Sequence, residues 1–561
     1  MIRTFEEHKL RAVHSLDGCW NLKPLDDSGR VFTAMVPGVW ERIPALARYR
    51  GKAEYTRTVT LDEAGNVLLR FGGASHTARV FWDDEQVATH YSAYTAFETV
   101  IENAEAGEHT LRVEVDNAYS EESTLHVPND YQTYGGLNRP VEMQMLGSCY
   151  IQRMAFTCEE TGEGAYTARV RVYVKAIAAV QGMQIAASVA GASAAAEVPA
   201  LAAGEEACVA LELNVTNVQK WDIHQGNLYD LCVQLVKDAR PVDDLIDRVG
   251  FRTVKVEGEK ILLNGRPVFL KGFNRHEDHG QFGCAISVDA MMDDLYLMLD
   301  MGVNSIRTSH YPNDPRFLDL CDELGLLVWE EHHARALSGE IMRKPLFAEQ
   351  CRVCNEEMIA QHINHPCIYV WGLLNECESE TEFGRSVYET QINQLRQLDP
   401  SRPITFASCR HFKDICLDLV DIVSFNIYPQ WYLPESTDKW ITREMEWMET
   451  VGAKNKPIIF SEFGAGAVAG FHDPFTRAKW SEERQADILE EQLGSLLSNP
   501  RVTGTYIWQF CDVNVSEENS WVMRRPKGQN NKGVVDLYRR PKLSYNTVKA
   551  AYTAKADTIE E

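Results

Sequence analysis

Two glutamates follow apolar strands in the C-terminal half of the sequence. Glu376 comes after the apolar run 368–374, and Glu462 ends a second apolar run that begins at residue 457. A buried carboxylate costs free energy unless it has a partner or a function. Glycoside hydrolysis needs two carboxyl groups flanking the scissile bond, about 5–5.5 Å apart when one is the nucleophile and the other the acid/base. The pair predicts a retaining glycosidase, although a salt-bridged strand-end glutamate would explain either residue alone.

The segments around these glutamates predict a parallel α/β fold. From about residue 253 onward, apolar strands alternate with helical segments. Eight β/α units over this length fit a TIM barrel, which carries its catalytic groups at the C-terminal ends of its strands. The predicted strands are 267–273, 303–308, 326–331, 367–374, 403–407, 421–426, 457–462 and 503–509, and the predicted helices include 289–301, 314–324, 346–363, 382–398 and 482–498.

The same rule brings further polar and aromatic residues toward the glutamates. Arg307 closes the second predicted strand, and Asn375 follows the fourth. Asn426 and Tyr428 follow the sixth strand, and Trp508 lies on the eighth. We expect these side chains to surround the two carboxyl groups, because the C-terminal strand ends of a barrel meet at one face.

The first half of the chain predicts two β-sandwiches ahead of the barrel. Residues 1–152 contain short alternating strands separated by turn residues, which is typical of an antiparallel sandwich. Residues 153–252 repeat the pattern and fit an immunoglobulin-like sandwich. The alanine-rich stretch 185–203 alternates with Val and Leu, so we expect strands there. The predicted domains are therefore 1–152, 153–252 and 253–561, and the clearest sandwich strands are 67–71, 78–82, 109–115 and 166–174.

Composition excludes several kinds of partner. The 561 residues include 56 Lys and Arg against 81 Asp and Glu, a formal charge of −25, which argues against nucleic acid and anionic membranes. No apolar run reaches the roughly 18 residues of a membrane helix, and the N-terminus lacks the apolar core of a signal peptide, so a cytoplasmic protein is expected.

The 14 cysteines form no disulfide scaffold, and the pair Cys351 and Cys354 lies in a helical-looking stretch without a second pair. We expect no metal and no cofactor.

The sequence resembles the β-glucuronidases of glycoside hydrolase family 2, of the bacterial type with a short lid loop. The resemblance covers essentially the whole chain and implies a jelly-roll sandwich, an immunoglobulin-like sandwich and a C-terminal (β/α)8 TIM barrel. It also implies that Glu376 is the acid/base and Glu462 the nucleophile. Cys377 stands where the family usually has proline. The residues that carry the resemblance are 36–38, 271–278, 304–312, 375–376 and 461–464.

The resemblance implies how a sugar acid would be recognised. Asn530 and Lys532 match the spacing of a family motif, Asn-x-Lys, that binds the C6 carboxylate. A cation and an amide donor select a carboxylate because charge-assisted hydrogen bonds are about twice as strong as neutral ones. A polar surface turn that happens to contain a lysine is the alternative explanation for this segment.

Four further residues are expected to contact the substrate or its surroundings. Tyr428 and Tyr432 match the family's Asn-x-Tyr-x-x-x-Tyr segment, in which the first tyrosine touches the nucleophile and the second the sugar. Asp130 resembles an aspartate that reaches the sugar hydroxyls from the first domain, and His276 lies in the motif 271–278. A core tyrosine or a surface Asn-Asp turn remains the alternative explanation for Tyr432 and Asp130.

The loop after the third strand leaves the identity of the sugar open. Arg335 follows His332 and His333 where better-known family members have small apolar residues. Arg335 is either a surface charge or a contact to an axial O4, as galacturonic acid presents. The predicted reaction is hydrolysis of small-molecule or oligosaccharide β-D-glucuronides, with a β-galacturonidase or mixed specificity as the alternative; a β-galactosidase or an inactive carbohydrate-binding protein is less favoured. A homo-oligomer is expected.

Overall fold

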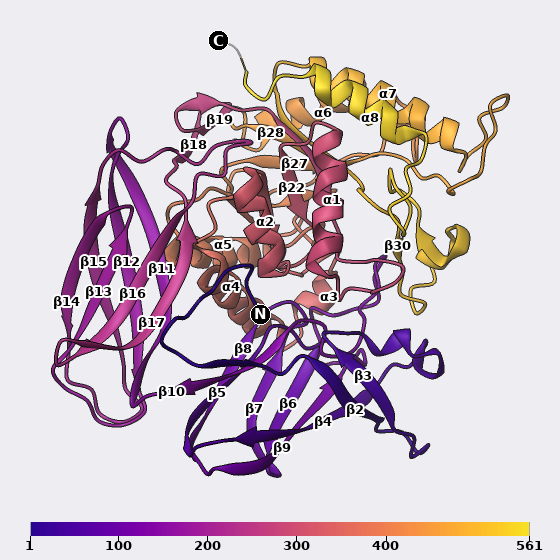
Figure 1. Ribbon diagram of the computed structural model, residues 1–561. Coiled ribbons are helices and arrows are strands. Elements are labelled where there is room, and N and C mark those ends of the chain that lie inside the picture. Colours follow the sequence, from indigo (N-terminus) through magenta and orange to yellow (C-terminus); the bar gives the residue numbers. More distant parts are fainter. Residues whose placement is uncertain (1, 560–561) are drawn as a thin grey trace.

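The computed structural model describes residues 2–559, which form two β-sandwiches beside a barrel (Figure 1). The first sandwich consists of a four-stranded and a six-stranded sheet, with strand orders β1-β10-β5-β8 and β3-β2-β4-β9-β6-β7. Alternate residues of each strand, such as Tyr55 and Val113, point into one apolar core. The strands are β1 (Val13–Ser15), β2 (Gly18–Pro24), β3 (Phe32–Val36), β4 (Lys52–Leu61), β5 (Gly65–Phe71), β6 (Thr77–Trp82), β7 (Glu85–Tyr91), β8 (Phe97–Ala104), β9 (Gly107–Asp116) and β10 (Val141–Leu146).

The second sandwich packs a three-stranded sheet, β11-β12-β15, on a four-stranded sheet, β14-β13-β16-β17. The alanine-rich stretch forms β13 and β14 as predicted. The predicted boundary at 152/153 falls inside β11 and stays a prediction, as does the boundary at 252/253. The strands are β11 (Cys149–Gly162), β12 (Ala165–Ala176), β13 (Met183–Val189), β14 (Ala192–Val198), β15 (Glu206–Val215), β16 (Tyr229–Lys237) and β17 (Arg240–Val249).

The rest of the chain forms the predicted TIM barrel. Nine parallel segments follow the order β25-β24-β23-β22-β21-β29-β28-β27-β26. β25 and β26 are successive pieces of one strand on either side of Phe406, which gives the eight strands that the sequence predicts. The segments are β21 (Leu270–Asn274), β22 (Ser305–Thr308), β23 (Leu327–Glu331), β24 (Ile368–Gly372), β25 (Ile404–Thr405), β26 (Ala407–Ser408), β27 (Val423–Asn426), β28 (Ile458–Phe463) and β29 (Val502–Ile507).

Helices surround these strands and confirm the predicted alternation. The five predicted helices are present, and α3, α6 and α8 add to them. A small sheet, β18 (Val254–Glu257), β19 (Lys260–Leu263) and β20 (Arg266–Pro267), precedes the barrel, and β30 (Val513–Asn514) pairs with β31 (Gln529–Asn530) after it. The helices are α1 (Val288–Asp300), α2 (Pro315–Leu324), α3 (Gly339–Met342), α4 (Phe347–His362), α5 (Glu382–Leu398), α6 (Thr437–Thr450), α7 (Glu482–Ser498) and α8 (Ser544–Ala554). None of the helices in residues 2–559 combines the length and apolar character that a bilayer crossing needs.

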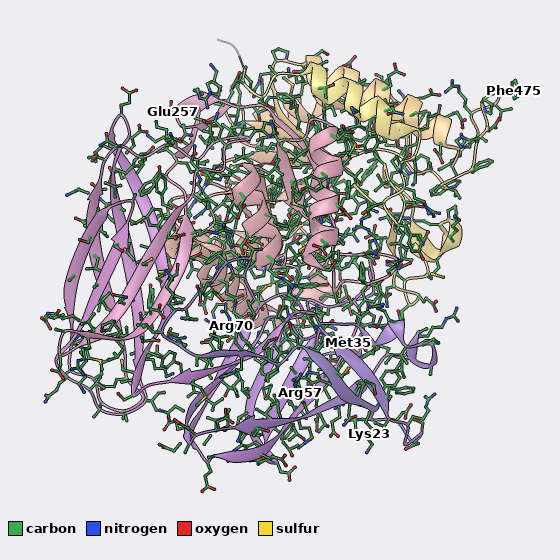
Figure 2. All side chains as sticks on the ribbon, in the orientation of Figure 1. Lys23, Met35, Arg57, Arg70, Glu257 and Phe475 are labelled. Carbon is green, nitrogen blue, oxygen red and sulfur yellow. The ribbon has the colours of Figure 1, made fainter. Side chains whose placement is uncertain are left out.

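Buried ion pairs hold the first sandwich against the barrel. Arg139 donates to Glu277 over 3.0 Å, and the Tyr134 hydroxyl donates to Asp278 over 2.8 Å. The N-terminal segment continues this contact, because Arg3 pairs with Asp319 of α2 at 2.7 Å. Arg70, labelled in Figure 2, lies beside this segment and pairs with Glu7. The segment between β9 and β10 is thereby fixed over the C-terminal ends of the barrel strands.

Candidate active site

Glu462 is the penultimate residue of the buried strand β28 and is held by two donors. Arg307 donates from Nη1 to its Oε1 over 3.2 Å, and the Tyr428 hydroxyl donates to its Oε2 over 2.8 Å. The Glu462 side chain is only 2% exposed. Both donors favour the ionised carboxylate and hold it in position.

Glu376 follows β24 and is held more loosely. Asn426 donates from Nδ2 to Oε1 of Glu376 over 2.9 Å, and in the barrel sheet Asn426 is the register partner of Glu462. Arg335 Nη2 lies 3.7 Å from Oε2, and the side chain is 16% exposed. The Glu376 backbone has a φ of +54°, a conformation that costs a non-glycine residue about 1–3 kcal/mol. Arg410 donates to the Glu376 carbonyl over 3.1 Å and helps to hold this turn.

Arg307 lies behind Glu462 and directs its donors to protein groups. Its guanidinium donates to both oxygens of Glu331, over 2.8 and 3.0 Å. It also donates to Asn375 Oδ1 over 2.8 Å and to Asn274 Oδ1 over 3.0 Å. The structure thus places Arg307 as a support for the surrounding side chains rather than as a free donor to a ligand.

A group of buried rings lies beside this support. His310 stacks on Trp508 with ring centroids 5.0 Å apart, and His276 meets Trp508 edge-on at 5.4 Å. Burial, and then neighbouring positive charge, lower the pKa of both histidines well below its usual value. They are therefore neutral at physiological pH. Tyr131, from the first sandwich, packs against the His276 ring at 4.8 Å.

Asp130 crosses from the first sandwich into this group. Arg335 Nη1 lies 3.0 Å from its Oδ1, while Arg525 and Asn530 donate to its Oδ2 over 3.2 and 3.1 Å. Burial alone would raise the pKa of Asp130, but Arg335, Arg525 and Lys532 lower it well below its usual value. Asp130 is therefore ionised and holds two arginines together.

Lys532 is buried between two tyrosines. Its Nζ lies 5.3 Å from the Tyr428 ring centroid and 5.4 Å from that of Tyr432. Burial and the charge of Arg525 lower the pKa of Lys532, whereas Tyr432 raises it. Tyr432 is 49% exposed, so it is not a core tyrosine.

Glu376 lies close enough to Glu462 to affect its ionisation. Burial, and then the charge of Glu376, raise the pKa of Glu462 to about 8, while Arg307, Arg335 and the Tyr428 hydroxyl oppose this rise. The charge of Glu376 and the hydrogen-bond donors around Glu462 therefore act on the same carboxyl group in opposite directions.

Several buried polar atoms around the glutamates point to a polar ligand. They are donors and acceptors that burial would leave unsatisfied, at a cost of about 1–3 kcal/mol each. A molecule rich in hydroxyl and carboxylate groups could satisfy them. Those without a hydrogen-bond partner among residues 2–559 are His276 Nε2, His310 Nε2, Arg335 Nε, Asn375 Nδ2 and Asn530 Oδ1.

A possible metal-binding group lies elsewhere, at the N-terminal end of β24. Asp322, His365 and Cys367 are buried and place their ligand atoms within 4.8 Å of one another. The Asp322 carboxylate already contacts His365 Nδ1 at 2.5 Å and accepts from the Cys367 amide over 2.9 Å. A buried histidine–aspartate pair accounts for this group.

The structure brings together every residue that the sequence singled out, and it adds others. Arg525, Glu331, Asn274 and His310 were not among the predicted site residues. His310 and Asn274 lie in the segments 304–312 and 271–278, so their position after barrel strands was an available signal. Arg525 lies in an irregular loop, where no periodicity indicates which side chain turns inward.

Two parts of the chain, the second sandwich and the barrel, match known family domains. Residues 254–556 match the glycosyl hydrolases family 2 TIM barrel domain, and residues 151–252 match a second glycosyl hydrolases family 2 domain. A β-glucuronidase of Streptococcus agalactiae is 25% identical over 95% of this chain and 95% of its own length. The human β-glucuronidase is 28% identical over 95% of this chain and 87% of its own.

Solved structures show the same fold. A GH2 β-galacturonidase from Eisenbergiella tayi bound to galacturonate is 44% identical, with a TM-score of 0.96 over 100% of both chains. A β-D-glucuronidase of Dictyoglomus thermophilum is 25% identical, with a TM-score of 0.86 over 99% of both chains. The similarity therefore extends over both sandwiches and the barrel.

Proposed function

The chain belongs to glycosyl hydrolase family 2 and is a glycosidase, and from this membership and the geometry above we propose that it is a retaining exo-β-uronidase that prefers β-D-galacturonides. The observation that carries the proposal is the cluster of Arg335, Arg525 and Lys532 beside the two glutamates. In a protein with a formal charge of −25, three cations at one site provide a local field that attracts an anionic sugar.

We assign the two carboxyl groups from their donors. Glu462 receives hydrogen bonds from a guanidinium and a phenol, which stabilise its charged form, so it is the nucleophile. Glu376 receives only an amide hydrogen bond and is partly exposed, so it can exchange a proton with the substrate and with water, and it is the acid/base. Glu376 gives a proton to the glycosidic oxygen while Glu462 bonds to the anomeric carbon and the glycosidic bond breaks. Glu376 then removes a proton from the water that attacks the anomeric carbon and releases the sugar from Glu462.

Lys532 and Asn530 support recognition of the C6 carboxylate. Lys532 is buried and has no carboxylate of residues 2–559 in an ion pair with it, so a ligand carboxylate can take that place. Asn530 is fixed through its Nδ2 to Asp130. Arg525 adds a second cation on the same side, because it lowers the pKa of both Lys532 and Tyr432.

Arg335 supports the preference for galacturonides. Its side chain is only 13% exposed, and it lies between Asp130 at 3.0 Å and Glu376 at 3.7 Å, with its Nε free of protein partners in residues 2–559. This placement makes Arg335 a donor to a sugar hydroxyl such as an axial O4. The Eisenbergiella tayi enzyme, bound to galacturonate, supports the same choice. The similarity to β-glucuronidases favours glucuronides as the second candidate.

A panel of p-nitrophenyl β-glycosides tests the proposal. We expect the highest kcat/KM on the galacturonide, a lower value on the glucuronide, and at least about tenfold less, or 1.4 kcal/mol, on the galactoside, which lacks the carboxylate. NMR should show the β-anomer of the sugar as the first product. A faster galactoside would overturn the uronide assignment, and an α-anomer would overturn retention.

A further inference from the structure

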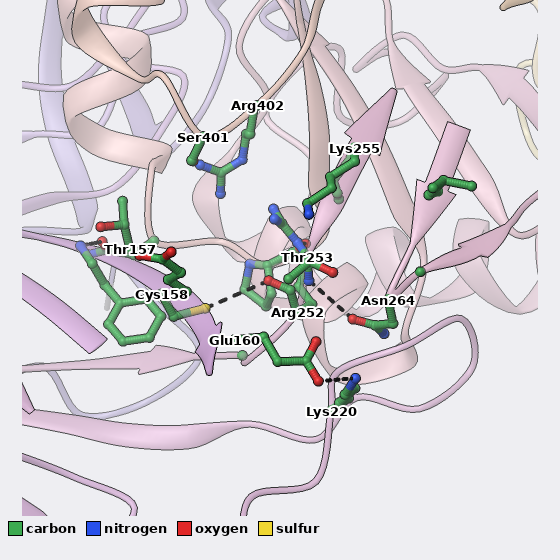
Figure 3. A pocket seen from close by; sticks show the side chains of 18 of the residues that line it. Thr157, Cys158, Glu160, Lys220, Arg252, Thr253, Lys255, Asn264, Ser401 and Arg402 are labelled. Atoms are coloured by element: carbon green, nitrogen blue, oxygen red, sulfur yellow. Dashed lines mark hydrogen bonds and ion pairs between the residues drawn. The ribbon is translucent and has the colours of Figure 1, made fainter. Parts of the chain in front are cut away.

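A cavity of about 810 Å³ lies between the second sandwich and the barrel (Figure 3). Its walls come from β11, from the turn at Lys220, from the β18–β19 hairpin and from the loops that precede β24 and β25. No residue of the candidate active site lines it. A space of this size falls within the range of about 300–1,000 Å³ that is typical of small-molecule sites.

Arg252 is a buried cation at this cavity without an acidic partner. The residue is 9% exposed, and its guanidinium donates to the carbonyls of Pro366 over 2.8 Å and Ile368 over 2.7 Å. Within residues 2–559, no carboxylate forms an ion pair with it, and its Nη1 makes no hydrogen bond. Figure 3 shows its side chain among the residues that line the cavity. A buried charge satisfied only by carbonyl oxygens is costly, so an anion would stabilise it.

Arg402 increases the positive charge at the same place. Its own donors are used by Asp399, at 2.7 Å, and by the carbonyls of Ile363, His365 and Ile368. Burial, and then the charge of Arg402, lower the pKa of Arg252 to about 10. Arg252 therefore still carries its charge at neutral pH.

The remaining walls select the type of anion. Lys220 is already paired with Glu160 at 2.7 Å. Neutral polar groups are provided by Thr253, Asn264 and Thr157. A phosphate dianion carries two negative charges and would be repelled by the wall carboxylates more strongly than a sugar acid, which carries one. The hydroxyl groups of a sugar acid can also donate to the wall carboxylates while its own carboxylate accepts from Arg252. The carboxylates that line the cavity are those of Glu159, Glu160, Glu163 and Glu257.

From this arrangement we propose that the cavity is a second carbohydrate site, which binds an acidic sugar of one or two rings with its carboxylate on Arg252. This site is separate from the two glutamates, so it has no part in the bond cleavage. It would let the enzyme hold an acidic saccharide, as free product or as part of a longer chain, while a uronide is hydrolysed at the barrel mouth.

Crystals of the unmodified enzyme soaked in D-galacturonate or in D-galactose test the site directly. The two sugars differ only at C6, so the neutral sugar is a matched control. We expect density for galacturonate with its carboxylate at Arg252, and no density there for galactose at the same concentration. Equal density for both sugars, or none at Arg252, would overturn the proposal.

Calorimetry in solution tests whether galacturonate binds this site only at the high concentration used for soaking crystals. In an Asn530→Ala/Lys532→Ala background, which weakens the catalytic site, galacturonate should still bind with a stoichiometry of one. Adding Arg252→Met should weaken this binding at least tenfold, and Arg252→Lys should retain part of it. Lys255 is an exposed cation of the cavity wall, and Lys255→Ala should leave the binding unchanged.

Tighter binding of inorganic phosphate than of galacturonate would contradict an acidic-sugar site. Equal losses for Arg252→Met and Lys255→Ala would contradict it as well. If Arg252→Met does not fold, the crystal soaks and the calorimetric stoichiometry still test whether galacturonate binds at this site.

Discussion

The two halves of the site are built in different ways. The half around Glu462 uses residues at the ends of barrel strands, with Arg307 on β22 and Asn274 on β21. The half around Glu376 is assembled from loops of two parts of the chain, because Asp130 comes from the first sandwich and Arg335 from the loop after β23. In the first half, the donors of Arg307 and Asn274 have protein partners, whereas in the second half Arg335 keeps a donor without one.

This contrast suggests that the strand half carries out bond cleavage and that the loop half recognises the sugar. Strand ends are rigid and hold reacting groups in place, while loops can vary in sequence without changing the fold. Changes in the strand half should therefore affect every substrate equally. Changes in the loop half should alter the preference among substrates, and the experiments below compare the two outcomes.

Glu462→Gln should have the largest effect. An amide cannot form the covalent intermediate, so kcat should fall at least about 100-fold on the galacturonide, the glucuronide and the galactoside alike. Circular dichroism should show an unchanged fold, because glutamine has the size of glutamate and its one side-chain oxygen can still accept a hydrogen bond from Arg307 or from Tyr428. Activity above about one hundredth of the original on any of these substrates would reject the assignment of the nucleophile.

Glu376→Gln should have an effect that depends on the leaving group. A p-nitrophenolate leaves without protonation, so glycosylation of Glu462 should survive while an alkyl glycoside loses about 100-fold or more. Added azide should restore turnover of the p-nitrophenyl substrate, because it needs no general base. Equal losses on both leaving groups would reject the role of Glu376 as the acid/base.

Lys532→Ala tests recognition in the loop half. We expect a loss of at least about tenfold in kcat/KM on the galacturonide, or 1.4 kcal/mol, and little change on the galactoside. Lys527→Ala, in the same segment but outside the cluster, is the matched control. A proportional loss on both sugars would make Lys532 a structural residue instead.

Arg335→Ala should change the ratio between the two uronides. Loss of one hydrogen bond to O4, worth about 1 kcal/mol, corresponds to a roughly fivefold greater loss on the galacturonide than on the glucuronide. Arg335→Lys should preserve the charge beside Asp130 but not the planar donor geometry. Equal losses on both uronides would show that Arg335 only holds Asp130 and Glu376 in place.

The strand half was predictable from the sequence, and the loop half only in part. The predicted barrel strands 457–462 and 303–308 carry Glu462 and Arg307 at their C-terminal ends, and the barrel then determines where these ends meet. The contact of Asp130 with Arg335 spans more than 200 positions and two domains, so no local pattern encodes it. Arg525 turns inward from an irregular loop because Asp130 attracts it, which only the assembled structure shows. Asp130 was predicted only through the resemblance to a family, and Arg525 was not predicted at all.

Tyr428→Phe should give the smallest effect, a shift in the pH profile. The nucleophile must be ionised, so activity rises as pH increases through the pKa of Glu462, which burial and Glu376 raise to about 8. The Tyr428 hydrogen bond lowers this pKa, so its loss should raise it and move the acidic limb to higher pH. A hydrogen bond of about 1 kcal/mol corresponds to a shift of about 0.7 pH unit, because one unit is 1.36 kcal/mol. Tyr432→Phe, whose hydroxyl makes no contact with Glu462, should leave the acidic limb in place. A limb that moves to lower pH, or that moves equally in both variants, would show that the Tyr428 hydroxyl does not stabilise the charged nucleophile.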